Sequence, residues 1–366
     1  MEEAELLSGP TRRATMNDVA AHAGVSLKTV SRVVNGDSAV IEETRTRVQR
    51  SIEQLGFRRN DSARQLRTGR TAGIGLILED VADPFYSTLT RAVEQVATAH
   101  DCLLFTGSCD DDPGQEQKLA LALCARRVDG LLIVPAAADH TYLAPELAAG
   151  LPAVFIDRPP VNLAADMVLT DNEGGAANGI AHLIRGGHRR IGYLGDTPAI
   201  HTAAERLKGY RAAMADHGLP VDESWISMGR LDQEQLRAEL IRLLTGPDRV
   251  TALFTGNNRL TVAVLRELAH LPGRDSGSAP ASRPANGGRA AHPELTTRPA
   301  LVGFDDFELA DLVVPGVTVV AQDPAGLGRM AAELLFDRLA GLSEPPRRLI
   351  LPTTVIPRGS GEIRPA

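Results

Sequence analysis

Apolar and polar residues alternate in blocks along most of the 366-residue chain, and the blocks have the lengths of strands and helices. A first series has strand-like apolar runs at 73–79, 102–106, 130–134 and 153–157, separated by helical stretches near 86–100, 114–127 and 141–149. A second series has strands near 167–170, 191–195, 225–228, 251–254, 300–303 and 317–321, with helices near 174–186, 203–217, 233–245 and 259–270. This alternation predicts parallel sheets with crossover helices, which bind ligands at the carboxyl ends of their strands. Two such series predict an α/β core with two lobes around a cleft.

The first 70 residues show a helical pattern instead. Thr15-Met16-Asn17-Asp18 predicts a capping box at the start of a helix over 16–22, and Gly24 suits the positive φ of the turn that follows. Ser26 predicts the N-cap of a second helix that runs to about residue 35. Helix, short glycine-containing turn and helix form the helix-turn-helix pattern. A third helix with one apolar stripe is predicted over 42–55.

Apolar spacing divides the first two helices into a buried and an exposed face. Side chains placed to pack between the helices are Val19, Ala20, Val25, Val30 and Val33. The outer face of the second helix is then left to Leu27, Lys28, Thr29, Ser31 and Arg32. Side chains of these kinds contact DNA base edges and phosphates.

Charge is distributed unevenly along the chain. The whole chain carries a formal charge of −7, which by itself argues against nucleic acid as a partner. Residues 11–70, however, hold twelve lysines and arginines against six acids, a net charge of +6, and residues 71–366 carry −10. A basic N-terminal region, the head, followed by an acidic remainder, the body, favours nucleic acid or another anionic surface as the binding partner. A solvated basic face is the simpler alternative.

Several protein classes are excluded by motifs that the sequence lacks. Cys102, Cys109 and Cys124 form no CxxC pair, which predicts buried apolar side chains and a reducing compartment. The chain starts with acidic residues rather than a secretory signal, and no apolar run approaches the roughly 20 residues of a membrane span, so we expect a cytoplasmic protein with no membrane contact. The motifs GxxxxGK[ST], HExxH, GxSxG and GxGxxG are absent, so we expect no enzyme, no cofactor and no metal.

A long, gapless block of the head resembles the lactose-repressor (LacI/GalR) family of bacterial transcriptional regulators. The matching segments are 15–20 (TMNDVA), 23–26 (AGVS) and 29–36 (TVSRVVNG), continued by Glu43-Thr44-Arg45 and Leu55-Gly56-Phe57. In the body, family blocks match at 83–86, 157–158, 171–172, 187–195, 206–210, 256–258 and 303–306. The resemblance therefore spans about residues 14–358.

The resemblance implies a DNA-binding surface. The second helix would enter the major groove with Leu27, Lys28 and Arg32 at base edges, and Leu66 of a hinge helix would enter the minor groove. The implied DNA-binding residues are Thr15, Ser26, Leu27, Lys28, Thr29, Ser31, Arg32, Asn35, Asn60, Ala63 and Leu66. Two positions depart from the family pattern: Arg59 replaces a proline before the hinge, and Ile41 replaces a serine N-cap of the third helix.

The resemblance also implies an effector site in the cleft. Its residues are Phe85, Tyr86, Asp157, Asp171, Arg206, Asn257 and Asp305. The arginine would clamp polar groups of the effector, Asp305 would accept hydroxyl protons, and Asn257 can both donate and accept. Asp157 and Asp171 follow strands, where a carboxylate either contacts the effector or only caps a helix. A polar set of this kind suits a sugar or sugar derivative.

The implied architecture is an α/β, two-lobed, periplasmic-binding-protein-like core behind an all-α helix-turn-helix domain. The predicted parts are a disordered extension (1–13), the helix-turn-helix domain (14–59), a hinge helix and linker (60–70), an N-terminal core lobe (71–171 plus 324–351) and a C-terminal core lobe (172–323 plus 352–358). Residues 272–299 are rich in Pro, Gly, Ser and Ala and are predicted to be a flexible insertion of the second lobe.

The predicted function is that of a sequence-specific transcriptional repressor whose operator affinity changes when a sugar-like effector binds between the lobes. Its partners would be double-stranded DNA with a pseudo-palindromic operator, the effector, and a second copy of the chain in a homodimer. The alternative is a solute-binding protein with the same body fold and no regulatory role.

Overall fold

The computed structural model describes residues 14–34, 36–58, 71–270 and 298–365. These residues fall into two compact units, one ending at Thr71 and the other beginning at Ala72. We call the described part of the first unit the head and the second unit the body.

The head is a bundle of three short helices, as the sequence predicts: α1 (Met16–Ala23), α2 (Leu27–Val34) and α3 (Glu42–Gln54). Its small core consists of Val19, Ala20, Ala23, Val30, Val33, Val40 and Val48, with Val25 packed against it. The capping box is present, since the Thr15 backbone N–H donates to Asp18 at 2.7 Å and the Asp18 N–H donates to the Thr15 hydroxyl at 3.3 Å. Gly24 has φ of 65°, and Ile41 provides no side-chain cap for α3, also as predicted.

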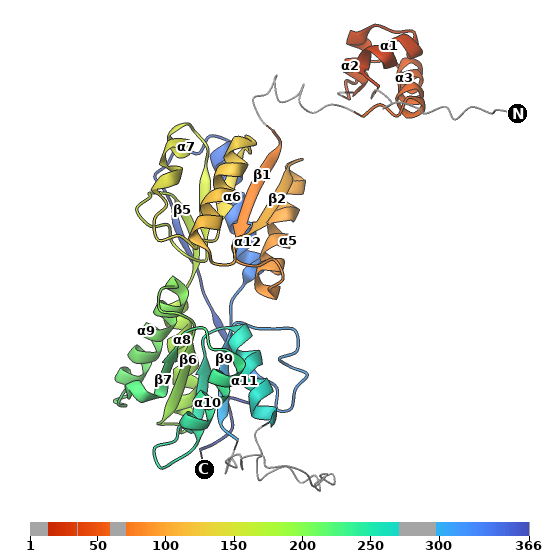
Figure 1. Cartoon of the computed structure of the whole chain (residues 1–366). Helices are drawn as coiled ribbons and strands as arrows, with labels where there is room; N and C mark the ends of the chain where they lie inside the picture. The colour runs from red at the N-terminus through yellow and green to blue at the C-terminus, as the bar shows by residue number, and fades with distance from the viewer. Residues whose placement is uncertain (1–13, 35, 59–70, 271–297, 366) are drawn as a thin grey trace, which may run out of the picture. The chain divides into compact units, whose positions relative to one another are not determined.

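The body contains two six-stranded sheets (Figure 1). In the first sheet the order is β11-β5-β4-β3-β1-β2, all parallel. Its strands are β1 (Gly73–Leu78), β2 (Leu103–Ser108), β3 (Gly130–Ile133), β4 (Ala153–Ile156), β5 (Asp166–Thr170) and β11 (Arg348–Leu351). Its helices are α5 (Pro84–Ala99), α6 (Pro113–Ala125), the turn η1 (Thr141–Leu143), α7 (Ala144–Ala148) and α12 (Pro324–Leu339). We call this layer structure the first lobe.

The second lobe repeats the plan around the order β12-β10-β9-β8-β6-β7, in which only the β10–β12 pair is antiparallel among the described strands. Its strands are β6 (Ile191–Gly195), β7 (Ile226–Met228), β8 (Ala252–Thr255), β9 (Ala300–Phe304), β10 (Thr318–Ala321) and β12 (Thr354–Ile356). Its helices are α8 (Asn172–Arg185), α9 (His201–Asp216), the turn η2 (Glu223–Trp225), α10 (Gln233–Leu244) and α11 (Asn258–His270).

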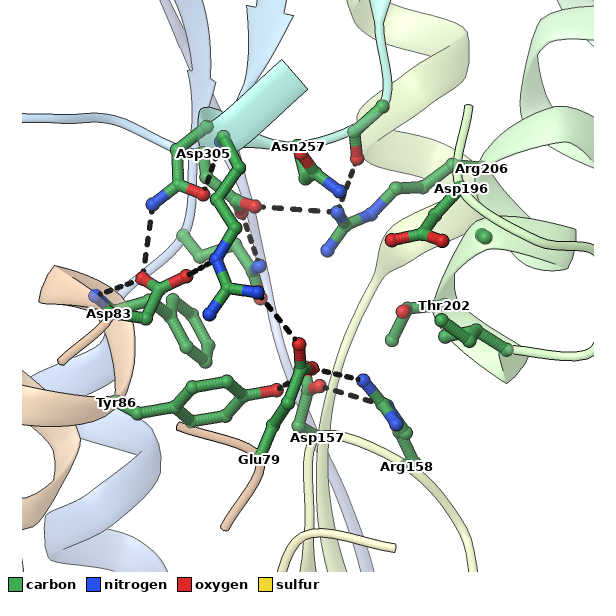
Figure 2. A pocket seen from close by; sticks show the side chains of 17 residues that line it. Glu79, Asp83, Tyr86, Asp157, Arg158, Asp196, Thr202, Arg206, Asn257 and Asp305 are labelled. Carbon is green, nitrogen blue, oxygen red and sulfur yellow. Dashed lines mark hydrogen bonds and ion pairs between the residues drawn. The ribbon is translucent and has the colours of Figure 1, made fainter. Parts of the chain in front are cut away.

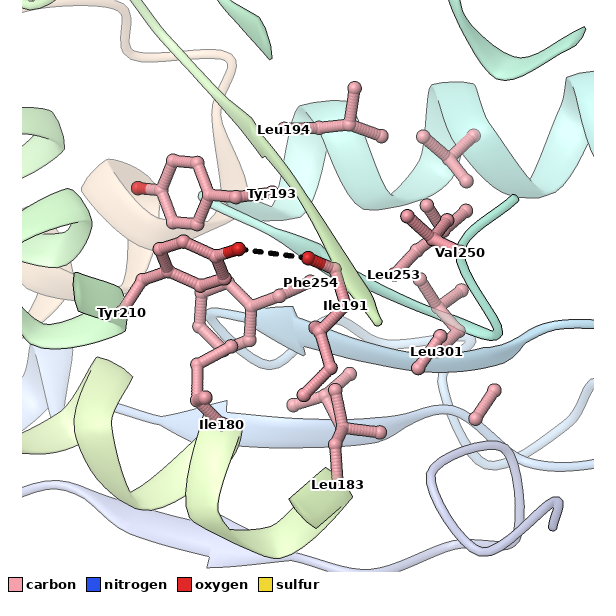
Figure 3. Packing of buried hydrophobic residues seen from close by; sticks show 14 of the residues in the cluster. Ile180, Leu183, Ile191, Tyr193, Leu194, Tyr210, Val250, Leu253, Phe254 and Leu301 are labelled. Carbon is pink, nitrogen blue, oxygen red and sulfur yellow. Dashed lines mark hydrogen bonds between the residues drawn. The ribbon is translucent and has the colours of Figure 1, made fainter. Parts of the chain in front are cut away.

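The core of the second lobe lies between its sheet and the flanking helices. Figure 3 shows Ile180 and Leu183 of α8 packed with Tyr193, Tyr210 and Phe254. The Tyr193 ring stacks on Phe254 with centroids 5.8 Å apart, and the Tyr210 hydroxyl donates to the Ile191 carbonyl at 2.9 Å. Burial of these large side chains stabilises the sheet edge that carries the site described below, because each contributes about 1.5–3 kcal/mol.

Three predictions about the body need correction. The strand at 166–170 belongs to the first sheet, not to the second series, because it pairs with β4 and β11 before the chain crosses to α8. The predicted helix at 141–149 is a 3₁₀ turn followed by the five-residue α7. Helix α12 was not predicted, although it packs against α5 as the central helix of the first lobe.

The chain crosses between the lobes at three places, after β5, after β10 and after β11. These crossings make the two sheets adjacent, with the cleft between them at the carboxyl ends of their parallel strands. Within the described residues, no helix is both long enough and apolar enough to cross a membrane.

Candidate functional site

The exposed face of α2 carries the side chains that the sequence assigns to DNA contact. Leu27, Lys28 and Arg32 are exposed, whereas Thr29 and Ser31 are half-buried. The Ser26 hydroxyl caps the helix, since the Thr29 backbone N–H donates to it at 3.2 Å. An apolar tip, two cations and several hydroxyls thus share one surface, which is the mixture that reads base edges and holds phosphates.

Arg32 is held by a neighbour that sequence reasoning missed. Its Nε donates to the Asp37 carboxylate at 2.7 Å, and this hydrogen bond raises the pKa of Arg32 and lowers that of Asp37. Asp37 is itself fixed, because its other oxygen accepts from the Ala39 N–H at 2.9 Å and its carbonyl accepts from Arg45 at 3.0 Å. Asp37 therefore positions the guanidinium through its Nε.

Four of the assigned DNA-binding residues, Asn35, Asn60, Ala63 and Leu66, lie outside the described residues, as does Arg59. Thr15 is described, and its hydroxyl donates to Asp18 at 2.7 Å within the capping box. That hydroxyl can still accept a hydrogen bond, but it has no second proton to donate to a phosphate.

A polar pocket lies between the two lobes, where strands of both sheets end. Acidic or amide side chains follow β1, β4, β6, β8, β9 and β10 at Glu79, Asp157, Asp196, Asn257, Asp305 and Gln322. The N-terminal ends of α5, α9 and α11, with their N-caps, supply Asp83, Phe85, Tyr86, Ile200, Thr202, Ala203, Arg206, Asn258 and Arg259. Arg158 and Gly256 complete the lining. The pocket and its open mouth together enclose about 560 Å³ of space free of protein atoms.

Six of the seven predicted effector residues line this pocket: Phe85, Tyr86, Asp157, Arg206, Asn257 and Asp305. Asp171 does not, because its carboxylate accepts from the Gly174 N–H at 2.9 Å and caps α8. Of the two functions that the sequence left open for Asp171, helix capping is the one the structure displays. The remaining lining residues were missed, although Glu79, Asp196 and Gln322 each directly follow a strand and could have been found from that rule alone.

Arg206 is the central cation of the second lobe. Its Nε donates to Asn172 at 2.8 Å, one terminal nitrogen donates to the Gly256 carbonyl at 2.5 Å, and the same nitrogen lies 3.4 Å from Asp305. The guanidinium carbon lies 3.8 Å from the centroid of the Phe304 ring. Buried and held on several sides, the planar group keeps its remaining donors in a fixed direction toward the pocket.

Two buried aspartates face each other across the pocket from opposite lobes, as Figure 2 shows for Asp157 and Asp305. Both have left-handed backbone, with φ of 68° and 70°, a conformation that costs energy outside glycine and is found at functional sites. Burial raises the pKa of Asp157, and one of its oxygens accepts no hydrogen bond from any described residue. Asp305 accepts from the Gln322 amide at 2.6 Å. These oxygens are acceptors for a ligand that donates hydroxyl protons.

Ion pairs connect the lobes around the pocket. Arg259 of the second lobe lies 3.0 Å from Glu79, 3.0 Å from Asp80 and 2.9 Å from Asp83 of the first. The Asn258 amide also donates to Asp83 at 3.1 Å. Relative movement of the lobes would have to break these contacts.

The charge of the pocket is negative overall. Five carboxylates, Glu79, Asp83, Asp157, Asp196 and Asp305, face three arginines among the described lining residues. Burial and the neighbouring Asp111 raise the pKa of Glu79. No group of three or more potential metal ligands occurs among the residues that the structure describes.

The chain matches two protein families. Residues 15–60 match the family described as bacterial regulatory proteins, lacI family, and residues 71–354 match the periplasmic binding proteins and sugar binding domain of the LacI family. The HTH-type transcriptional regulator CelR of Thermobifida fusca is 32% identical over 96% of this chain and 99% of its own length. The regulator PtxS of Pseudomonas plecoglossicida is 34% identical over 98% of both chains. A solved structure described as a transcriptional regulator CelR–cellobiose complex is 30% identical, with a TM-score of 0.63 over 95% of this chain and 100% of the other.

Proposed function

Because the chain belongs to the LacI family of bacterial regulatory proteins and is a DNA-binding transcriptional regulator, we propose that the polar pocket binds its effector, a neutral sugar or sugar derivative. Binding of this effector changes the affinity of the protein for its operator. The family is regulatory, so the pocket binds the sugar without transforming it.

The observation that carries this proposal is the convergence of hydrogen-bonding groups at the carboxyl edges of both sheets. Arg206 offers fixed donors, the buried oxygens of Asp157 and Asp305 offer acceptors, and Tyr86 and Phe85 add aromatic surface. Sugars combine hydroxyls that donate and accept with apolar C–H faces, so they fit such a site. The cellobiose complex of a relative 30% identical to this chain supports the same class of ligand.

Pocket charge supports a neutral ligand over an acidic one. With five carboxylates against three arginines, an added carboxylate or phosphate would meet net repulsion in a partly desolvated site. Effector control then requires different effector affinities in two arrangements of the lobes. The interlobe contacts of Arg259 and Asn258 stabilise the arrangement that the structure displays.

The exposed face of α2 is the proposed DNA-reading surface. Leu27, Lys28 and Arg32 contact base edges, while Ser26, Thr29 and Ser31 hold the backbone phosphates. We propose that a homodimer presents two such surfaces to a two-fold symmetric operator and represses transcription, in the cytoplasm where bacterial DNA lies. The solute-binding alternative does not explain the match of residues 15–60 to DNA-binding regulators.

A thermal-shift screen of neutral sugars, sugar acids and purines tests the proposal. A ligand at 100 times its Kd stabilises the native state by about 2.7 kcal/mol, which gives a clear rise in Tm. We expect neutral sugars to produce the shift, the recovered sugar to be chemically unchanged, and an Arg206→Lys variant that still folds to lose it. Shifts confined to sugar acids or purines, or equal shifts in the variant, would contradict the proposal.

A further inference from the structure

The three crossings between the lobes come together around the Arg206 guanidinium. Gln322 belongs to the second crossing, which leads from β10 to α12 of the first lobe. Its amide donates to Asp305 at 2.6 Å, and Asp305 lies 3.4 Å from a terminal nitrogen of Arg206. The arginine proposed to bind the sugar is therefore linked to this crossing through one carboxylate.

The third crossing, between β11 and β12, reaches the same guanidinium by packing. Thr353 lies in this crossing, next to the first turn of α8. A Cβ added to Gly175 of α8 would lie 2.6 Å from the Thr353 hydroxyl and 3.1 Å from the Phe304 ring. The Arg206 guanidinium lies 3.8 Å from the centroid of that ring. Because a glycine stands at this position, the helix approaches both groups closely.

The first crossing, after β5, reaches Arg206 through the side chain of Asn172. This residue begins α8, is only 4% exposed and does not line the polar pocket. Its Oδ1 accepts from the Arg206 Nε at 2.8 Å, and its Nδ2 donates to the Thr170 carbonyl at 3.2 Å. Thr170 is the last residue of β5, so this amide connects the arginine of the second lobe to a strand of the first.

The two partners fix the orientation of the Asn172 amide. An arginine Nε can only donate and a carbonyl can only accept, so Oδ1 must face Arg206 and Nδ2 must face Thr170. Because the amide is planar, its two ends cannot move independently. All three residues are buried, so a hydrogen bond that is broken at either end leaves a polar group without a partner, which costs free energy.

The backbone of the first crossing is also attached to the third. The Asp171 N–H donates to the Leu351 carbonyl at 2.9 Å, and Leu351 is the last residue of β11. A change in the backbone torsions of the first crossing therefore acts on the third crossing as well.

We propose that Asn172 is a positioning residue that couples sugar binding at Arg206 to the first crossing. The inference rests on the proposed function and deepens it, because it names a residue through which the sugar controls the position of the lobes. Rotation of the lobes changes the backbone torsions between Thr170 and Asn172, and with them the direction of the amide. A sugar that holds Arg206 therefore stabilises the arrangement in which both hydrogen bonds of Asn172 are kept.

Asn172→Asp tests this coupling with a change that conserves shape. The carboxylate still accepts from Arg206 but cannot donate to the Thr170 carbonyl. Operator affinity is measured by fluorescence anisotropy on the full-length protein, without and with a saturating concentration of the sugar found by the screen. We expect sugar binding to persist. The sugar-induced change in operator affinity should shrink at least about twofold, the equivalent of a hydrogen bond worth ~0.5 kcal/mol.

Two further variants separate coupling from stability. Asn172→Ala removes both hydrogen bonds, so it should weaken sugar binding in calorimetric titrations and also reduce the sugar-induced change. Asp171→Ala is the matched control, because it removes the N-cap of the same helix and leaves the contacts of Asn172 in place. We expect Asp171→Ala to lose stability in urea titrations and to keep the full sugar-induced change.

Other results would overturn the coupling by Asn172. A full wild-type change in folded Asn172→Asp or Asn172→Ala protein would do so, as would an equal reduction in Asp171→Ala or complete loss of sugar binding in folded Asn172→Asp. Each of these leaves the sugar effector intact. An operator affinity that the sugar does not alter in the wild-type protein would instead contradict the proposed function itself.

Discussion

Replacing Arg259 with methionine removes a cation that connects the two lobes. This arginine begins α11 in the second lobe and contacts Glu79, Asp80 and Asp83 of the first at 2.9–3.0 Å. Methionine keeps much of the length of the side chain and leaves the three carboxylates without this partner.

The expected free-energy effect of the substitution follows from the solvent exposure of the Arg259 side chain. The Arg259 side chain is 49% exposed, so each of its ion pairs is worth about 0.2–1 kcal/mol, and the set about 1–2 kcal/mol. That range corresponds to a change of roughly 5- to 30-fold in the ratio of closed to open body. Sugar affinity should fall by up to the same factor, because the polar pocket is complete only when the lobes are together and affinity follows the closed fraction of the protein.

Calorimetric titration with the sugar found by the screen, together with stopped-flow dissociation, measures this effect. Arg266→Met is a matched control, since Arg266 is an exposed arginine of the same helix outside the polar pocket lining. We expect faster dissociation and weaker binding in Arg259→Met alone, with circular dichroism unchanged. Unaltered affinity and dissociation in Arg259→Met would refute the reasoning that these pairs hold the closed body together.

Three further substitutions have separate readouts. Asp171→Ala should lower the free energy of unfolding by about 0.5–2 kcal/mol in urea titrations, because α8 loses its N-cap, and sugar affinity should not change. Weaker sugar binding by this variant would show that Asp171 does contact the effector. Burial opposes ionisation of Glu116, but its hydrogen bonds, with that of His140 the largest, lower the pKa of the carboxyl below its ordinary value of 4.5. The ionised carboxylate therefore contributes its full stabilisation above pH 4.5, and this stabilisation is lost as the pH falls through the lower pKa of the folded state. Urea titrations should show this acid-side loss in the native protein and a shallower one in Glu116→Gln; identical pH profiles would disprove it. Asp37→Asn should reduce operator discrimination several-fold and raise non-specific DNA binding, because Arg32 loses its support and the head loses an acid; competition anisotropy that finds specificity intact would exclude this function.

Local patterns were sufficient for the head. The capping box of Thr15 and Asp18, the positive φ of Gly24 and the valine spacing each depend on residues within one or two turns, and all are present in the structure. The missed support of Arg32 by Asp37 lies five residues away and depends on how the chain leaves α2, which no helical pattern encodes.

The polar pocket could be predicted in part because parallel strands bring their carboxyl ends to one edge. That rule, together with family blocks, indicated Asp157, Asn257 and Asp305. It could not show that Arg259 crosses to the other lobe or that Asp171 turns back to cap its own helix, because these contacts depend on the relative position of the lobes and on side-chain direction.

The central claim, sequence-specific DNA binding that a sugar controls, is tested most directly by one equilibrium measurement. Operator DNA selected from a random pool by the full-length protein is titrated by fluorescence anisotropy at several salt concentrations, with and without the sugar. We predict a two-fold symmetric selected sequence, an affinity that falls steeply with salt, and a change of roughly 5- to 150-fold when the sugar is added. A pool that yields no preferred sequence, or an operator affinity that the bound sugar leaves unchanged, would contradict the account.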